Sequence, residues 1–160
     1  MRTLKAALVF ALLVLGASGA RAEFSTDDIG KGTFAVGVNY PGLGVKYFVT
    51  DNYAAELKGQ GESGNDVGGL RGYRYFRPDP KIFLFVGLEG DYVRFRGDSS
   101  KGGGYLGEVF AGSEYFVLPH VGIQADLGPA YVDLKDTATS LSAGGIEFIF
   151  NVGINYYFGK

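Results

Sequence analysis

The chain has 160 residues, enough for one domain, and it contains no cysteine, so neither disulfide bonds nor thiolate-bound metals hold it together. Its 17 acidic residues exceed its 15 basic ones, a balance that argues against nucleic acid as a partner. Glycine occurs 27 times and aromatic residues make up 15% of the chain, a mixture typical of many short strands joined by tight turns.

Residues 1–22 have the features of a cleavable export signal peptide. A basic start precedes an apolar run over residues 6–15, and Ala20-Arg21-Ala22 provides the small residues of a cleavage site. The run is too short to cross a bilayer as a helix, which takes about 20 residues. Cleavage after Ala22 removes three of the 15 basic residues and leaves 12 against 17 acidic ones, a net charge of −5 for the mature domain, 23–160.

Apolar residues alternate with small or polar ones along the whole mature chain, and this period of two predicts eight β-strands. In chain order, the predicted strands are residues 34–40, 43–49, 53–58, 67–76, 82–96, 105–117, 121–134 and 146–158. The predicted connections, which are rich in glycine, proline and polar residues, are 41–42, 51–52, 62–66, 77–80, 98–104, 118–120 and 135–143.

The last strand carries the clearest alternation. Every even-numbered position from Ile146 to Phe158 is apolar or aromatic, whereas Glu147, Asn151 and Asn155 occupy odd-numbered positions. Soluble strands usually have about six residues, and tilted strands that cross a membrane need about 9 to 11. Because only a closed barrel satisfies the backbone hydrogen bonds of strands in lipid, the pattern predicts an eight-stranded antiparallel up-and-down transmembrane β-barrel.

The lengths of the connections predict an orientation. Connections after even-numbered strands are short, and those after odd-numbered strands are mostly longer and polar, apart from Pro41-Gly42. Outer-membrane barrels have short periplasmic turns and longer external loops, so both termini are predicted to be periplasmic. A Tyr-Phe pair near the end of each even-numbered strand predicts an aromatic girdle at that rim, although simple alternation does not point the same member of each pair outward; the pairs are 47–48, 75–76, 115–116 and 157–158.

With these features the mature chain resembles the family of small eight-stranded outer-membrane barrels that includes OmpX, the OmpA transmembrane domain, OmpW and the opacity proteins. The most specific match is to the family's C-terminal assembly signal, at Asn151, Gly153, Tyr156 and Phe158, although the family often ends on the aromatic residue and here Gly159 and Lys160 follow. The resemblance implies a monomer in the Gram-negative outer membrane. Its implied partners are membrane lipid and lipopolysaccharide and, during biogenesis, periplasmic chaperones and the barrel-assembly machinery.

A soluble lipocalin-like barrel would show the same alternation but would point its apolar face inward. Here the opposite face interleaves polar residues with glycine, which suits a cramped barrel interior better than a solvated surface, and tryptophan is absent. We therefore predict an interior polar cluster in which carboxylates outnumber bases and share protons or bridging waters. Its predicted members are Lys46, Glu56, Lys58, Glu89, Asp91, Glu114, Asp126 and Glu147, with Glu108 and either Arg71 or Arg74 as further inward charges.

Catalytic chemistry finds little support in the sequence. His120, the only histidine, lies in a predicted periplasmic turn, away from the external rim where some small barrels modify lipid A. The runs 102–104 and 30–32 lack the strand–helix context of phosphate-binding loops and are interpreted as flexible segments. No cofactor or metal site is predicted. We expect a non-enzymatic envelope-structural or surface-interaction role; the alternative is a narrow channel for small hydrophobic or ionic solutes, and a lipid A-modifying enzyme is the least favoured.

Overall fold

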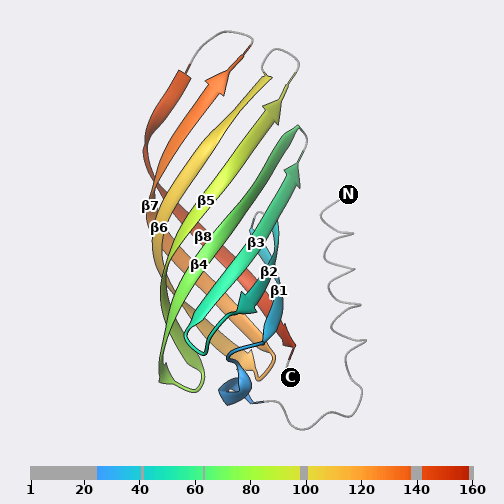
Figure 1. The fold of residues 1–160 in the computed structure, drawn as a ribbon, viewed down its shortest axis with the longest axis vertical. Helices are drawn as coiled ribbons and strands as arrows, with labels where there is room; N and C mark the ends of the chain where they lie inside the picture. Colours follow the sequence, from blue (N-terminus) through green and yellow to red (C-terminus); the bar gives the residue numbers. More distant parts are fainter. Residues whose placement is uncertain (1–24, 41, 63, 98–100, 138–141, 159–160) are drawn as a thin grey trace.

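The computed structural model is a closed antiparallel barrel in which each strand pairs with the next and β8 pairs with β1, so the predicted fold class is confirmed (Figure 1). The structure describes residues 25–40, 42–62, 64–97, 101–137 and 142–158, and the predicted signal peptide lies outside them. A short 3-10 helix, η1 (Thr26–Asp28), precedes the barrel. The strands are β1 (Phe34–Tyr40), β2 (Gly42–Phe48), β3 (Tyr53–Glu62), β4 (Asn65–Asp79), β5 (Ile82–Arg96), β6 (Lys101–Leu118), β7 (Val121–Asp136) and β8 (Ser142–Phe158). Within the described residues, no helix is both long and apolar enough to cross a membrane.

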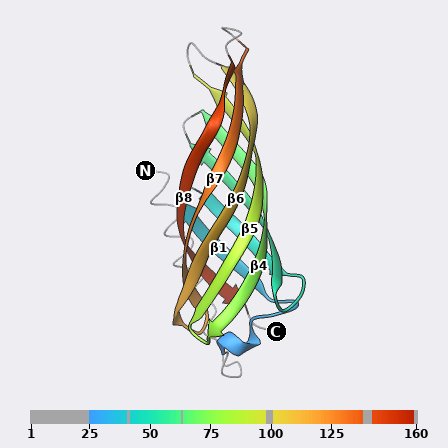
Figure 2. The same ribbon diagram turned by 90° about the vertical axis from the view of Figure 1, so that its left-hand side faces the viewer.

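The strands differ greatly in length, so the barrel wall is uneven. We call the rim at which β2, β4 and β6 end the turn end, and the opposite rim the loop end. β1 and β2 have 7 residues each, whereas β6 has 18 and β8 has 17. The β1–β2 hairpin therefore ends far below the tops of β5 to β8 (Figures 1 and 2).

Four predicted connections are at least two residues shorter in the structure, namely 62–66, 77–80, 98–104 and 135–143. β4 continues through Pro78 to Asp79, because a β-bulge places Arg77 and Pro78 opposite the single residue Phe83. Pro78, which has no N–H, therefore does not have to donate a backbone hydrogen bond to β5. The predicted loop over 98–104 ends early, since residues 102–104 belong to β6 and pair with both β5 and β7. Likewise β7 extends to Asp136 and β8 begins at Ser142.

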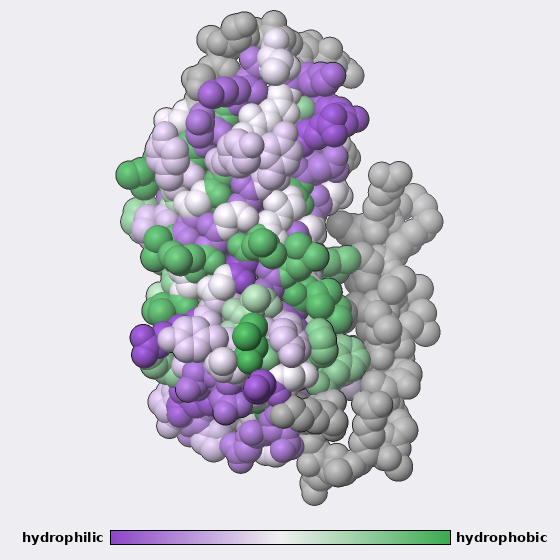
Figure 3. All heavy atoms as spheres, in the orientation of Figure 1, coloured by the Kyte–Doolittle hydropathy of each residue, from purple (hydrophilic) through white to green (hydrophobic). Residues whose placement is uncertain are grey.

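The outer face of the barrel is apolar around its middle. On the side shown in Figure 3, hydrophobic residues form a band and hydrophilic residues gather toward both ends. Exposed aromatic residues flank this band on both sides, as at the two interfaces of a membrane barrel. Those toward the turn end are Phe34, Tyr47, Tyr53, Phe76 and Tyr115, and those toward the loop end are Tyr92, Tyr105 and Tyr131.

The four Tyr-Phe pairs each contribute to two structures. One member of each pair lies on the outer face and the other is buried inside the barrel. The outward member is tyrosine in two pairs and phenylalanine in the other two, which is why alternation did not point the same member outward in all four. The buried members are Phe48, Tyr75, Phe116 and Tyr157. The girdle predicted at this rim is therefore formed by half of the eight residues, and the other half fill the interior behind it.

Candidate functional site

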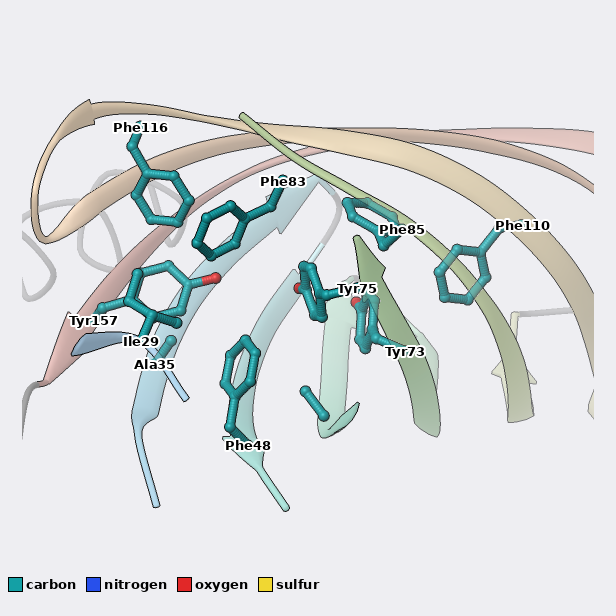
Figure 4. Packing of buried hydrophobic residues seen from close by; sticks show 11 residues of the cluster. Ile29, Ala35, Phe48, Tyr73, Tyr75, Phe83, Phe85, Phe110, Phe116 and Tyr157 are labelled. Atoms are coloured by element: carbon teal, nitrogen blue, oxygen red, sulfur yellow. The ribbon is translucent and has the colours of Figure 1, made fainter. Parts of the chain in front are cut away.

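The interior of the barrel at the turn end is filled by aromatic rings. This aromatic cluster consists of Phe48, Tyr73, Tyr75, Phe83, Phe85, Phe110, Phe116 and Tyr157, all buried (Figure 4). Neighbouring rings are in contact, with centroids 4.7 Å apart for Phe83 and Phe116 and 5.1 Å apart for Phe48 and Tyr75. Such separations are those of favourable tilted and edge-to-face pairs. The rings come from β2, β4, β5, β6 and β8, so they meet from around the barrel.

The segment before β1 covers the cluster from below. Ile29 is fully buried and belongs to the same cluster (Figure 4). The hydroxyl of Thr33 accepts a hydrogen bond from the Gly30 N–H at 3.1 Å and donates one to the Asp28 carbonyl at 3.3 Å. The carboxylate of Asp51, in the β2–β3 turn, accepts from the Lys31 N–H at 3.0 Å. Residues 30–32, interpreted as flexible from the sequence, therefore form a turn tied to the rim of the barrel.

Above the aromatic cluster lies a buried polar network centred on Lys46. Its ammonium donates to Gln124 Oε1 at 2.8 Å and to the Tyr75 hydroxyl at 2.9 Å, and lies 3.7 Å from a carboxylate oxygen of Glu114. Glu114 in turn accepts from Asn155 and from the Tyr157 hydroxyl, both at 2.7 Å. Buried ions are tolerated only when partners satisfy them in this way.

A second layer of the polar network is centred on Arg71. Its guanidinium contacts Glu89 and Asp126, each at 2.7 Å, and of the two arginines considered from the sequence it is the one that is buried. Lys58 pairs with both Glu89 and Asp91, at 3.0 Å for the latter. The network thus links strands β3, β4, β5 and β7 across the interior.

The register explains why these charges meet. Lys46, Glu56, Arg71 and Glu89 are direct cross-strand neighbours on β2, β3, β4 and β5, so the row alternates in sign along the hydrogen-bond direction. Glu108 on β6 continues the row next to Glu89 and breaks the alternation. Both of its carboxylate oxygens are buried without a hydrogen-bond partner among the described residues.

The structure corrects the prediction that Glu147 belongs to the interior polar cluster. Glu147 continues the same row beyond Ala130 of β7, but its side chain is exposed, whereas the other seven predicted members are buried or, for Lys58, partly buried. The physical reason is the short first hairpin. β8 pairs with β1 only from Val152 to Phe158, so Glu147 has no neighbouring wall on that side.

The same short hairpin leaves a chamber of about 170 Å³ above the polar network. Lys58, Arg71, Glu89 and Asp91 form its charged floor, and Asn39, Gly42 and Leu43 at the end of the β1–β2 hairpin form its low side. Aliphatic residues form much of the remaining wall, namely Val67, Val93, Leu106 and Ile149, together with Gly59, Gln60 and Asn151. The inner face therefore changes from aromatic and charged to aliphatic toward the loop end.

The four residues of the predicted assembly signal lie along β8, and three of them, Gly153, Tyr156 and Phe158, are in the part that closes the barrel against β1. Gly153 faces Asn39 and Phe158 faces Phe34 in the β1–β8 register. Asn151 belongs to the polar network, since its amide donates to Asp126 at 2.9 Å. A side chain at Gly153 would collide with the Asn39 side chain, so packing alone gives a reason for glycine there. Recognition by the assembly machinery stays a prediction.

The one histidine considered for catalysis lies in a turn rather than among the inward side chains of the strands. His120 lies in the turn between β6 and β7, and its ring stacks on Tyr156 with centroids 5.8 Å apart. Among the described residues no three His, Asp or Glu side chains are arranged to hold a metal ion.

No protein-family model matches the chain, and no curated protein matches it in sequence. Its structure is similar to the crystal structure of the N-terminal β-barrel domain of Pseudomonas aeruginosa OprF, with a TM-score of 0.58 and 14% sequence identity. The match covers 81% of this chain and 99% of that one. At this identity the likeness shows the fold, which is that of the small eight-stranded outer-membrane-type barrels, as the sequence predicted.

Proposed function

We propose that the protein is a closed outer-membrane barrel with a non-enzymatic role, contributing to envelope integrity and surface interaction through its loop end. In this proposal the turn end, where η1 and the last residue of β8 lie, faces the periplasm and the loop end faces outward. The apolar outer band with aromatic residues at both of its edges supports membrane insertion. The longest connection, between Asp136 of β7 and Ser142 of β8, lies at the loop end and supports the orientation.

The observation that carries the proposal is the filled interior. From Ile29 at the turn end to the layer of Arg71 and Glu89, the inward side chains are buried and contact one another. A water-filled path would have to separate the aromatic cluster and break the ion pairs of the polar network, both of which lose free energy. An eight-stranded barrel holds only enough space for such side chains.

Single-channel recording tests this proposal. The mature protein, refolded into lipid and verified by a heat-dependent gel shift, is added to a planar bilayer. We expect no discrete current steps, and a porin added afterwards to the same bilayer verifies that steps would be detected. Reproducible steps from the refolded protein would overturn the proposal and favour a channel, and failure to enter lipid would overturn the membrane location itself.

The chamber favours a second candidate function, in which small apolar solutes bind at the loop end. Its volume is close to that of an engineered apolar cavity of about 150 Å³ that binds benzene. Its low side includes Leu43, which is also exposed on the apolar outer face. In this candidate function a solute enters sideways, past Leu43, without crossing water.

Because the chain has no tryptophan, a single introduced one can report on this chamber. For Leu106→Trp, in the chamber wall, we expect quenching of fluorescence by a short brominated alkane. The matched control is Phe85→Trp, which lies on the same inner face within the aromatic cluster and should be protected. Equal protection of both tryptophans would remove the solute-binding candidate.

A further inference from the structure

The outer wall of the barrel has a groove near the loop end, separate from the interior, that crosses β5, β6 and β7. This outer groove has a volume of about 370 Å³. It is lined mainly by Tyr92, Arg94, Lys101, Tyr105, Asp133 and Lys135 together with the glycines 102–104 of β6. Of the six side chains, Asp133 is partly buried and the other five are exposed on the outer face.

The register places two cations on either side of an empty position. Arg94 on β5 pairs with Gly103 on β6, and Gly103 pairs with Lys135 on β7. Since neighbouring strands lie about 4.8 Å apart, the two cations rise from backbones about 10 Å apart with no side chain between them. A Cβ at residue 103 would lie 2.8 Å from the Val93 carbonyl oxygen and 3.3 Å from the Tyr92 hydroxyl, so glycine keeps this space open.

The charge of the outer groove contrasts with that of the whole chain. Arg96 pairs with Lys101 immediately above, so four cations gather here against two carboxylates, in a chain with net charge −2. The carboxylates are Asp133 and the exposed Asp66, which is the cross-strand neighbour of Arg94 on β4. None of the four forms an ion pair with another described residue. In the barrel interior, by contrast, each lysine and arginine of the polar network has a carboxylate partner.

The outer groove also lies at a defined depth. Its lower wall consists of the rings of Tyr92 and Tyr105, whose centroids are 5.4 Å apart and which belong to the aromatic residues flanking the apolar band. The outward residues below these rings are apolar, namely Leu88, Val109 and Leu127. Aromatic rings mark the boundary between lipid tails and headgroups, so the cations lie at headgroup level.

We propose that the outer groove binds the phosphorylated headgroup of a lipid in the surrounding leaflet. Arginine forms paired hydrogen bonds to phosphate oxygens, and lysine adds charge, so Arg94 and Lys135 would hold a phosphate over Gly103. The tyrosine rings would contact the part of the lipid between headgroup and chains. A free phosphate would contact only the cations, whereas a membrane lipid would contact both the cations and the tyrosine rings. The presence of both in one groove favours a lipid over a free phosphate. This inference rests on the proposed membrane location.

The test uses lipid nanodiscs that contain the refolded mature protein. Two phosphatidylcholine compositions are compared, one with a minor fraction of phosphatidic acid and one with the same fraction of diacylglycerol, which lacks only the phosphate. Native mass spectrometry then counts the lipids retained on the barrel. We expect one phosphatidic acid to be retained preferentially, and the double variant Arg94→Ala, Lys135→Ala to weaken its retention by about tenfold or more.

Two further variants separate charge from shape. Arg74→Ala removes an exposed cation on β4, far from the outer groove, and should leave lipid retention unchanged. Gly103→Val keeps all four cations but fills the space between them, and should lower retention. Equal retention of phosphatidic acid and diacylglycerol, or an equal loss in Arg74→Ala, would overturn the proposal.

Competition with inorganic phosphate distinguishes the two sources of phosphate. We expect inorganic phosphate to displace the lipid poorly; displacement at similar concentrations would show a site for free phosphate and overturn the lipid assignment. The gel shift is measured on every sample. A barrel that inserts but shows no lipid preference contradicts only this inference, whereas a barrel that does not insert contradicts the proposed function.

Discussion

The two halves of the barrel interior are built from the same strands and the same alternation, but they differ in packing. Toward the turn end all eight strands surround the interior, and aromatic and ionic side chains are fully buried. Toward the loop end the β1–β2 hairpin has ended, and the inward residues Val67, Val93, Leu106 and Ile149 are only half-buried around a chamber. The height of a single hairpin thus separates a closed half, filled by side chains, from an open half that contains the chamber.

The largest loss of stability is expected from Lys46→Met in the closed half. The substitution keeps the length of the side chain but leaves Glu114 charged and buried without its cation, and it removes the donor to Gln124. Breaking one partner of a buried ion pair costs about 4 kcal/mol of unfolding free energy. Urea titration of the refolded barrel in lipid measures the change.

The double variant Lys46→Met, Glu114→Gln provides the control for this prediction. It removes both charges, so it should regain a large part of the lost stability, because the penalty arises from the uncompensated carboxylate rather than from the missing ammonium. If the double variant were less stable than Lys46→Met alone, the assignment of this penalty would be wrong.

A pair of truncations compares the two halves directly. Phe85→Ala removes a ring that contacts Tyr73 and Tyr75 at centroid distances of 5.4 and 5.5 Å, and it should cost about 3 kcal/mol or more. Leu106→Ala, in the wall of the chamber, should cost about 1 kcal/mol, because the leucine is only half-buried and the space around it is already open. Equal losses in urea titrations would show that the two halves are packed alike.

The sequence predicted the strand number and the inward face because both depend on alternation with period two, a local property of the chain. The same rule placed Lys46 and Glu114 on one face. It could not choose between Arg71 and Arg74, because they lie on opposite faces of β4 and both faces also carry aromatic residues. The partners of either arginine depend on the register between strands. Register follows from hydrogen bonding between segments far apart in the chain.

Connections were predicted less well, for a related reason. Residues 102–104, all of them glycine, were predicted to lie in a loop, yet long neighbouring strands on both sides pair with them. Pro78 was predicted to lie in a turn, yet it belongs to β4, where a β-bulge accommodates it. The exposure of Glu147 depends on where β1 stops, and the outer groove depends on cations from three strands. Composition within a window carries none of this information.

Two glycines of β5 compare the inside of the barrel with its outer face. Gly87 faces inward, and a methyl group there would collide with the Phe110 ring and the Gly72 carbonyl oxygen, so Gly87→Ala should cost about 2 kcal/mol. Gly90 faces outward with nothing within 4 Å of the corresponding position, and Gly90→Ala should leave stability unchanged or slightly higher. Urea midpoints of both variants, measured in the same lipid, test the prediction; a similar loss in both would mean that strand flexibility, rather than interior space, requires glycine.

The smallest effect is expected at the cover of the closed half. Thr33→Val keeps the shape of the side chain but removes the hydrogen bonds to the Gly30 N–H and the Asp28 carbonyl, and it should cost about 1 kcal/mol. Thr33→Ser keeps the hydroxyl and serves as the control. Because these bonds hold the segment that carries Ile29 over the aromatic cluster, hydrogen exchange should increase in Thr33→Val at residues 29–33 and not in the barrel strands. Faster exchange along β2 or β4 as well would show that the cover and the aromatic cluster unfold as one unit, which would extend the closed half to include the segment before β1.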